Sequence, residues 1–150
     1  MGIKKYRMKT ILIITAVFPP EPIVSSQLSF DIADKMSEDY KVTVLHPRSS
    51  RPYGFSFDKK GNKVSQCEEI TIDSYVCPKS KLIGRFYESF SFGLHCKRYI
   101  EKYWNRFSCI YINSWPLFSQ ALIVKTAKKY KIPCVVHAVS YTHLTLPTIA

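Results

Sequence analysis

Six residues with ligand-binding chemistry stand just after apolar runs of the sequence. They are Ser25, Ser26, Arg48, Arg51, Asn113 and Trp115. Arginine side chains can hold a phosphate through paired hydrogen bonds, and serine hydroxyls can add to such a site. A tryptophan beside a polar residue is suited to stacking on a sugar ring. Structural explanations stay open as well: a solvated loop for the arginines, a helix cap for the serines and a helix anchor for Trp115.

The glycine and cysteine positions exclude several common kinds of site. Glycine stands only at positions 2, 54, 61, 84 and 93, so the sequence has neither a GxGxxG motif nor a Walker loop. It also lacks the GxSxG motif of serine hydrolases. The five cysteines show no CxxC or cysteine–histidine spacing, and we interpret them as free thiols in a reducing compartment. We therefore expect neither a cofactor nor a metal site.

Apolar runs and amphipathic stretches alternate along the chain. Residues 10–16 form a continuous β-branched run, typical of a strand buried on both faces of a parallel sheet. A helix capped by Ser25 or Ser26 follows and ends near Asp39. Further strands are predicted at 41–46, 70–76, 109–113 and 132–137, and further helices at 79–106 and 117–131. This alternation predicts an α/β fold with a Rossmann-like parallel sheet and flanking helices, which binds ligands beyond the carboxyl ends of its strands.

The helix predicted at 79–106 carries two apolar stripes. A break in this helix near 89–93 is an alternative. At 100° per residue, one stripe is expected to face the core, and it comprises Leu82, Phe86, Phe90, Ile100 and Trp104. The second stripe lies about a quarter-turn away among basic residues. It comprises Phe92, Tyr99 and Tyr103, with Lys81, Arg85 and Arg106 nearby. Aromatic residues among basic ones favour contact with an anionic membrane surface, and a second packing face is the alternative.

The composition predicts one folded domain with a strong positive charge. Of the 150 residues 46% are hydrophobic, and 22 Lys and Arg against 11 Asp and Glu give a net charge of +11. Such an excess favours an anionic partner: nucleic acid, an anionic membrane surface or a phosphorylated substrate. No apolar run is long enough to cross a bilayer, and no signal-peptide cleavage site follows the first run. We expect a cytoplasmic protein, and peripheral attachment to the inner face of the plasma membrane stays open.

The last residues of the chain differ in composition from the rest. Residues 139–150 contain no charged side chain, and VSYTHLTLPT is what one reading frame of a common transposase sequencing adapter encodes. The adapter bases before that frame permit only Ser, Pro, Thr or Ala at position 138, where the sequence has Ala138. We therefore expect 139–150 to be non-native, with His137 as the last native residue and Ala138 as the product of a hybrid codon.

Two long stretches together carry a family resemblance. TILIITAVFPPEPIVSSQLSFDIADKMSEDYKVTVLHPRSSRP contains a first strand, a Pro-Pro-Glu loop, a helix and a V-T-V-L strand, and CIYINSWPLFSQALIVKTAKKYKIPCVVH supplies a later βαβ stretch. In this order they resemble family 4 glycosyltransferases, especially enzymes that build bacterial surface polysaccharides such as capsule and lipopolysaccharide. The resemblance implies a GT-B fold, in which two Rossmann-like domains enclose the active site. Residues 8–138 would be an incomplete N-terminal, acceptor-side domain, and 1–7 an extension before it.

The resemblance also implies roles for residues at the strand ends. Glu21 belongs to the Pro-Pro-Glu loop, and in many relatives a glycine-rich turn after it faces the donor diphosphate. Residues 23–26 contain no glycine, so the helix start with Ser25 and Ser26 would take that place. In the family, the His or an acidic residue next to it lies near the acceptor hydroxyl, so His137 would be the catalytic residue, and a structural role at the end of its strand is the alternative.

The partners implied by the resemblance are a nucleotide sugar and a glycan or polyprenyl-linked acceptor, with no nucleic acid. In the family, the second domain binds the sugar nucleotide and usually carries a pair of glutamates. Because that domain is missing from the sequence, we expect the chain alone to be inactive. The alternative is a non-catalytic basic α/β module that binds nucleic acid or an anionic membrane surface.

Overall fold

A five-stranded parallel sheet forms the centre of the molecule. The computed structural model describes residues 9–49, 66–77, 81–113 and 117–137. The strands are β1 (Thr10–Ile14), β2 (Lys41–Pro47), β3 (Glu68–Ile72), β4 (Cys109–Asn113) and β5 (Cys134–His137). Their order across the sheet is β3-β2-β1-β4-β5, and every neighbouring pair is parallel. This arrangement confirms the predicted α/β class and the Rossmann-like sheet.

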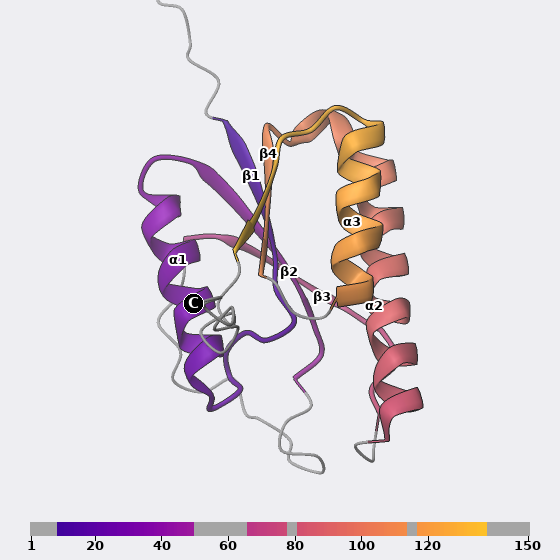
Figure 1. Cartoon of the computed structure of the whole chain (residues 1–150). Helices are drawn as coiled ribbons and strands as arrows, with labels where there is room; N and C mark the ends of the chain where they lie inside the picture. The colour runs from indigo at the N-terminus through magenta and orange to yellow at the C-terminus, as the bar shows by residue number, and fades with distance from the viewer. Residues whose placement is uncertain (1–8, 50–65, 78–80, 114–116, 138–150) are drawn as a thin grey trace, which may run out of the picture.

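Helices cover both faces of this sheet, as Figure 1 shows. Helix α1 (Val24–Ser37) lies on one face, and α2 (Leu82–Tyr103) and α3 (Leu117–Lys129) lie together on the other. A short 3-10 helix, η1 (Trp104–Arg106), follows α2 directly. All strands run the same way, so their carboxyl ends and the amino ends of the three α-helices meet at one edge, the lower edge in Figure 1.

Several elements begin or end at other residues than predicted. Strand β3 lies before most of the predicted 70–76 segment, and α2 runs without a break through 89–93. The prediction that Ser25 or Ser26 caps α1 is wrong, because Ile23 occupies the N-cap position with an extended backbone. Pro22 disfavours a helical conformation in the residue before it but not in the residues after it. The helix therefore begins almost as soon as the prolines end, and both serines lie in its first turn.

A small core lies between α1 and the sheet. Phe30 and Ala33 of α1 pack with buried side chains of β1 and β2, namely Ile13, Val42 and Val44, and Phe18 completes the cluster. Strands β1 and β2 thus bury residues on both faces, because Leu12, Ile14 and Leu45 belong to the core on the other side. This double burial explains why the two strands are continuously apolar in sequence.

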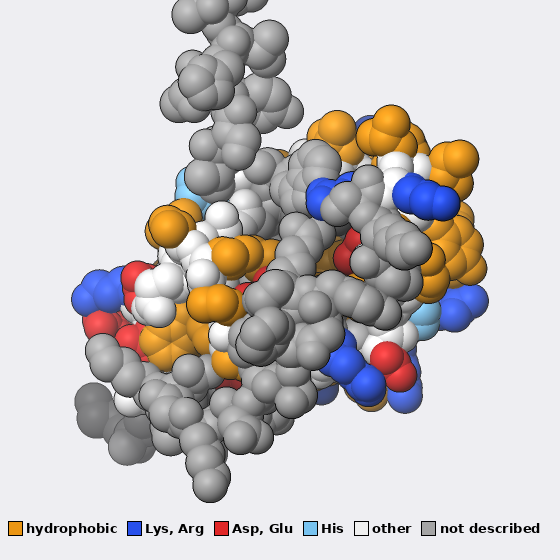
Figure 2. All heavy atoms as spheres, turned by 90° about the horizontal axis from the view of Figure 1, so that it is seen from below, with side chains coloured by type: hydrophobic (Ala, Val, Ile, Leu, Met, Phe, Trp, Pro, Cys, Tyr) orange, Lys and Arg blue, Asp and Glu red, His pale blue; other side chains and the backbone are white. Residues whose placement is uncertain are grey.

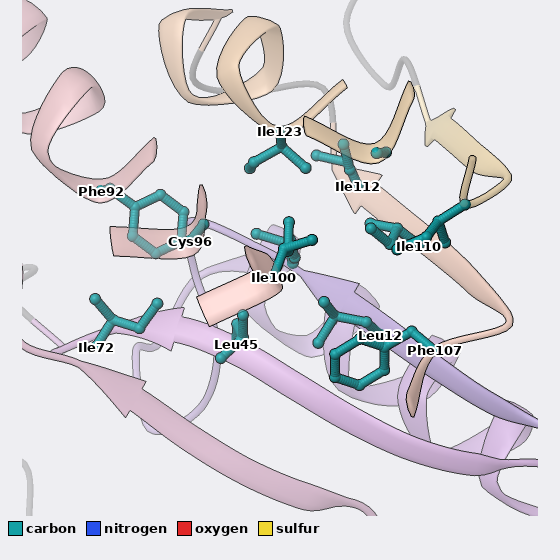
Figure 3. Packing of buried hydrophobic residues seen from close by; sticks show 13 residues of the cluster. Leu12, Leu45, Ile72, Phe92, Cys96, Ile100, Phe107, Ile110, Ile112 and Ile123 are labelled. Atoms are coloured by element: carbon teal, nitrogen blue, oxygen red, sulfur yellow. The ribbon is translucent and has the colours of Figure 1, made fainter. Parts of the chain in front are cut away.

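The larger core lies between the sheet and the pair α2 and α3. Phe92, Cys96 and Ile100 of α2 converge with Ile123 of α3 on the sheet (Figure 3). The sheet residues beneath them are Leu12, Ile14, Leu45, Ile72, Ile110 and Ile112. The two helices also contact each other, because the Ser119 hydroxyl of α3 donates a hydrogen bond to the Ser89 carbonyl of α2.

The two apolar stripes of α2 are only partly where they are predicted, because Ile100 of the first stripe is fully buried in the core as expected, whereas its other four members are exposed. Phe92 is only 3% exposed, and Tyr99 and Tyr103 pack against the same core, so this stripe does not face a membrane. Phe86 and Phe90, which were expected in the core, are 53% and 49% exposed. The core-facing side of α2 also carries small residues, which let α3 approach closely, and phenylalanines at those positions would keep the helices apart.

The basic residues expected beside the membrane face do not form one group. Lys81 is exposed and Arg85 is half-buried at the start of α2. Arg106 lies at the far end of the helix, where its guanidinium is 3.8 Å from a carboxylate oxygen of Glu68. The same guanidinium lies 5.3 Å from the ring centre of Tyr103, so Arg106 stands beside the second stripe as predicted, although that stripe packs against the core.

The thiols of Cys96, which is buried, and Cys134, which is half-buried, are expected to make the stability of the fold sensitive to alkaline pH. Burial raises the pKa of Cys96 far above its usual range, and burial together with the neighbouring Cys109 raises the pKa of Cys134 to about 11. In the unfolded chain these thiols lose their protons near pH 9, so the unfolded state binds fewer protons than the native state above that pH. We expect the free energy of unfolding, measured in urea, to fall as the pH rises from about 9 to about 11.

The contribution of Cys134 to this alkaline loss can be separated with a Cys134→Ala variant. The variant cannot ionise at this position, so its unfolding free energy should fall less steeply over the same pH range. A Cys134→Ala variant with the same pH slope as the unchanged chain would contradict the proposed origin.

Some sequence predictions fall outside the described residues. Arg51, Trp115 and the stretch 139–150 belong to this group, and their placement is not part of the structure described above. Among the helices that the structure does describe, none combines the length and apolar character that a transmembrane span requires. Over the same residues, no three His, Cys, Asp or Glu side chains gather closely enough to hold a metal ion.

Candidate functional site

The segment between β1 and α1 forms an open pocket at the carboxyl edge of the sheet. The pocket has a volume of about 360 Å³, and its walls are Pro19, Pro20, Glu21, Pro22, Ile23, Val24, Ser26 and Gln27. Proline fixes one backbone torsion angle, so the three prolines restrict the shape of this segment. Two of the predicted site residues, Glu21 and Ser26, meet here, whereas Ser25 is exposed and does not line the pocket.

The first turn of α1 presents hydrogen-bond donors at this pocket. The Ile23 carbonyl accepts hydrogen bonds from the amides of Ser26 and Gln27 at 3.0 and 3.3 Å. No acceptor for the amides of Val24 and Ser25 is found among the described residues, as is usual for the first turn of a helix. The positive end of the helix dipole adds to the attraction of these amides for an anion.

The Ser26 side chain is the most distinctive polar group of the pocket. It is only 1% exposed, and within the described part of the chain its Oγ has no hydrogen-bond partner. A buried hydroxyl without a partner costs stability, and most buried polar groups in proteins are paired. A ligand with oxygen atoms, seated in the pocket, would supply the missing partner.

A buried group of contacts holds the pocket segment in place. Thr15 Oγ1 lies 3.0 Å from Ser29 Oγ, and the Ser29 hydroxyl donates to the Ser25 carbonyl at 2.8 Å. On the other side of the segment, the ring of Phe18 stacks on the ring of His46, with 5.1 Å between centroids. These contacts connect the pocket to β1, β2 and α1, so its groups are held by regular secondary structure.

Glu21 gives the pocket a second kind of chemistry. Its side chain is buried, and a carboxylate accepts hydrogen bonds from hydroxyl groups but repels a phosphate. The start of α1, in contrast, attracts an anion. The pocket therefore suits a ligand that carries both hydroxyl and phosphate groups better than it suits inorganic phosphate.

His137 contacts a residue that the sequence patterns did not single out. The hydroxyl of Tyr111 and Nδ1 of His137 are hydrogen-bonded, and the two rings lie 5.9 Å apart. Burial raises the pKa of Tyr111, so its phenol is neutral at neutral pH and can either donate to Nδ1 or accept from Nδ1–H, depending on the tautomer of His137. The pair offers a hydroxyl and an imidazole, which are groups that can exchange a proton with a ligand.

The position of Tyr111 follows from strand geometry once the pairing of strands is known. Ile110 and Ile112 of β4 point to the core under α2 and α3, so Tyr111 between them points to the other face. In the parallel register of β4 and β5, Asn113 lies opposite His137 and Tyr111 lies opposite Val135. The alternation in CIYIN therefore indicates which face of the sheet Tyr111 occupies. It does not identify His137 as its partner unless the pairing of β4 with β5 is known.

The other predicted residues lie along the same edge of the sheet, outside the pocket. Arg48 follows β2 and forms an ion pair with Asp73 at 3.6 Å, and both side chains are exposed. Asn113 ends β4 and is partly buried. The structure thus places Glu21 and Ser26 in one pocket, pairs His137 with Tyr111, and leaves Arg48 and Asn113 outside the pocket walls.

Solved structures with a similar fold include two proteins of different kinds. The C-terminal domain (residues 78–226) of PF1911 hydrogenase from Pyrococcus furiosus aligns with a TM-score of 0.62 and 15% identity, covering 91% of this chain and 97% of that one. UGT2 from Phytolacca americana, complexed with UDP-2-fluoro-glucose and pterostilbene, aligns with a TM-score of 0.56 and 14% identity. That alignment covers 91% of this chain and 31% of UGT2.

These similarities concern the fold. No protein-family model and no curated protein matches the sequence at a significant level. At 14 and 15% identity, the two alignments show a shared arrangement of strands and helices. The fold of the chain therefore resembles both the PF1911 domain and one domain of UGT2, a GT-B protein, and the chain spans about a third of the length of UGT2.

Proposed function

We propose that this chain is the acceptor-side domain of a GT-B glycosyltransferase. The enzyme would move a sugar from a nucleotide sugar to a glycan or lipid-linked acceptor in the synthesis of cell-surface polysaccharide. The strongest support is the pocket at the start of α1, where a buried Ser26 hydroxyl without a described partner lies beside Glu21 and the first helical turn. The similarity of the fold to one domain of UGT2, which was solved with UDP-2-fluoro-glucose, also supports this assignment.

Each group of the site has a role in this proposal. The amides of Val24 and Ser25 and the Ser26 hydroxyl receive the donor phosphate, and the Glu21 carboxylate accepts a hydrogen bond from a sugar hydroxyl. In the tautomer in which Nδ1–H of His137 donates to the Tyr111 oxygen, Nε2 is free to take the proton of the acceptor hydroxyl. A second domain closes over the nucleotide, and the isolated chain binds the donor weakly without transferring its sugar, because half of the cleft cannot orient both reactants.

Binding of UDP-glucose to the pocket can be measured directly on the 150-residue chain. In a titration followed by NMR, we expect the amide signals of Val24, Ser25 and Ser26 to shift. A Ser26→Ala variant should bind about 10- to 100-fold more weakly, because a hydrogen bond to a charged group contributes about 1.5–3 kcal/mol. Ser37→Ala is the matched control, since the hydroxyl of Ser37 donates to the Asp34 carbonyl at the other end of the same helix.

Two further ligands separate this proposal from its alternative. Inorganic pyrophosphate should bind more weakly than UDP-glucose, because it meets the Glu21 carboxylate without offering hydroxyl groups. The net charge of +11 favours the alternative, a module that binds nucleic acid. If UDP-glucose leaves the α1 amides unchanged and a duplex oligonucleotide shifts them, the glycosyltransferase assignment is wrong.

A further inference from the structure

The amino ends of α2 and α3 together expose a group of large apolar side chains. These are Leu82, Ile83, Phe86, Tyr87 and Phe90 of α2, and Leu117 and Phe118 of α3, which we call the apolar tip. The rings of Phe86 and Phe118 meet edge to face with centroids 5.1 Å apart, so the contributions of the two helices are continuous. Figure 2 shows apolar side chains gathered, with basic ones among them, on the right-hand side, where α2 and α3 lie.

The apolar tip is separate from the core of the protein. At 100° per residue, Ile83, Phe86, Tyr87 and Phe90 fall within an arc of about 100°. The buried Phe92 lies on a different side of the same helix. Monomeric proteins rarely expose large contiguous apolar patches unless a partner surface covers them. We therefore expect a partner surface to cover the apolar tip.

Basic residues follow the apolar tip along the same face of each helix. On α3, Lys125 and Lys128 continue the row that begins with Leu117, and on α2, Lys97 continues the row of Phe86 and Phe90. With a rise of 1.5 Å per residue, Lys125 lies about 12 Å along the axis from Leu117, and Lys97 about 10 Å from Phe90. Apolar side chains of interfacial helices enter a bilayer by about 5–10 Å, so these lysines would stand at the level of the lipid headgroups.

We propose that the apolar tip and the lysines behind it form a docking surface for an anionic lipid bilayer. Charge complementarity supports this occupant: α3 contains no acidic residue, and α2 contains only Glu88 and Glu101. Oε1 of Glu101 lies 3.4 Å from Nζ of Lys129, and no ion pair of Lys97 or Lys125 is found among the described residues. A second copy of the chain fits less well, because two facing tips would bring like-charged lysine rows together.

This docking surface differs from the one that the sequence predicted. It contains residues of the α2 stripe that the sequence pattern assigns to the core. It also contains side chains of α3, and no pattern within α2 indicates that α3 lies beside them. It is independent of the proposed transferase activity, since the apolar tip shares no residue with the walls of the pocket. The two proposals can therefore fail separately.

Vesicle flotation of the 150-residue chain tests the apolar part of the surface. We expect binding to vesicles of phosphatidylcholine with about 30% phosphatidylglycerol, and much weaker binding to phosphatidylcholine alone. The double variant Leu82→Ser/Ile83→Ser should bind at least about tenfold more weakly, because it removes two inserted side chains. These residues are 77% and 83% exposed, so the unfolding midpoint should not change.

Val24→Ser is the matched control for the loss of an exposed apolar side chain. Val24 is 87% exposed and belongs to α1 on the opposite face of the sheet, so vesicle binding should stay unchanged. Equal losses in Val24→Ser and in the double variant would overturn the proposal, as would equal binding to neutral and anionic vesicles.

Charge reversal tests the basic part of the surface. Lys125→Glu/Lys128→Glu should lower binding to anionic vesicles by about tenfold or more, because each lysine near such a surface contributes about 1 kcal/mol. Lys9→Glu/Lys41→Glu makes the same change in charge at the amino ends of β1 and β2 and should have a much smaller effect. If the two pairs behave alike, net charge alone drives binding and the proposed surface is wrong. A different outcome would also overturn the proposal. If the unchanged chain forms a dimer in solution and the Leu82→Ser/Ile83→Ser variant is a monomer, the apolar tip binds a second copy of the chain instead of a bilayer.

Discussion

Replacing Phe92 with alanine is expected to lower the free energy of unfolding by about 3–5 kcal/mol, whereas Phe90→Ala should lower it by less than about 1 kcal/mol. The two residues are neighbours on α2, but Phe92 is 3% exposed and packs in the larger core, while Phe90 is 49% exposed. Both substitutions change helix propensity by the same amount, so the difference between them reports burial alone. Urea unfolding followed by circular dichroism measures both variants.

The outcome of this comparison bears on the membrane-docking surface as well as on the core. Comparable losses in the two variants would mean that Phe90 is packed against another part of the protein, and the apolar tip would then not be available for a bilayer. A small loss in Phe92→Ala would mean that the sequence-based assignment of the two stripes was correct.

The amphipathic pattern of α2 predicts the burial of Ile100 correctly but gives the wrong buried face in the first half of the helix. Leu82, Phe86 and Phe90 are large, apolar and regularly spaced, so amphipathic periodicity favours them for the core. The structure instead turns small residues, Ser89 and Gly93, toward the neighbouring elements. Which stripe is buried depends on the close approach of α3, and this information lies in another segment of the chain.

The parallel sheet was predictable because its signal is local. The continuous apolar runs of β1 and β2 reflect burial on both faces, and this property is visible in the sequence alone. The position of the site follows for the same reason, since the polar residues after β1 must lie at the carboxyl edge of a parallel sheet. Glu21 and Ser26 could therefore be identified as candidates, even though Ser26 was expected to cap the helix rather than lie inside it.

Contacts across the sheet were not predictable in the same way. Tyr111 and His137 are 26 positions apart, and their hydrogen bond requires β4 and β5 to be neighbours in one particular register. A one-residue change of register would place the two side chains on opposite faces of the sheet. No pattern within either segment specifies that register.

Gly93 is the residue of α2 at which the smallest change should have the largest structural effect. A Cβ atom at this position would lie 2.7 Å from the Cα atom of Ser119 and 3.0 Å from Cδ1 of Leu122. The Ser119 atom belongs to the backbone of α3, so it cannot move aside without a shift of the whole helix. Glycine at this position therefore allows α2 and α3 to pack closely enough for the Ser89 and Ser119 hydrogen bonds.

Gly93→Ala should consequently lower the free energy of unfolding by about 1–3 kcal/mol, despite a gain in helix propensity of about 1 kcal/mol. Gly84→Ala is the matched control, because its new Cβ would meet only the side chain of Cys77, which can rotate away. That variant should keep most of the propensity gain and be unchanged or slightly more stable in urea unfolding. If Gly93→Ala is as stable as Gly84→Ala, α3 is free to move away from α2, and the contact of Phe86 with Phe118 that joins the two halves of the apolar tip is not fixed by the fold.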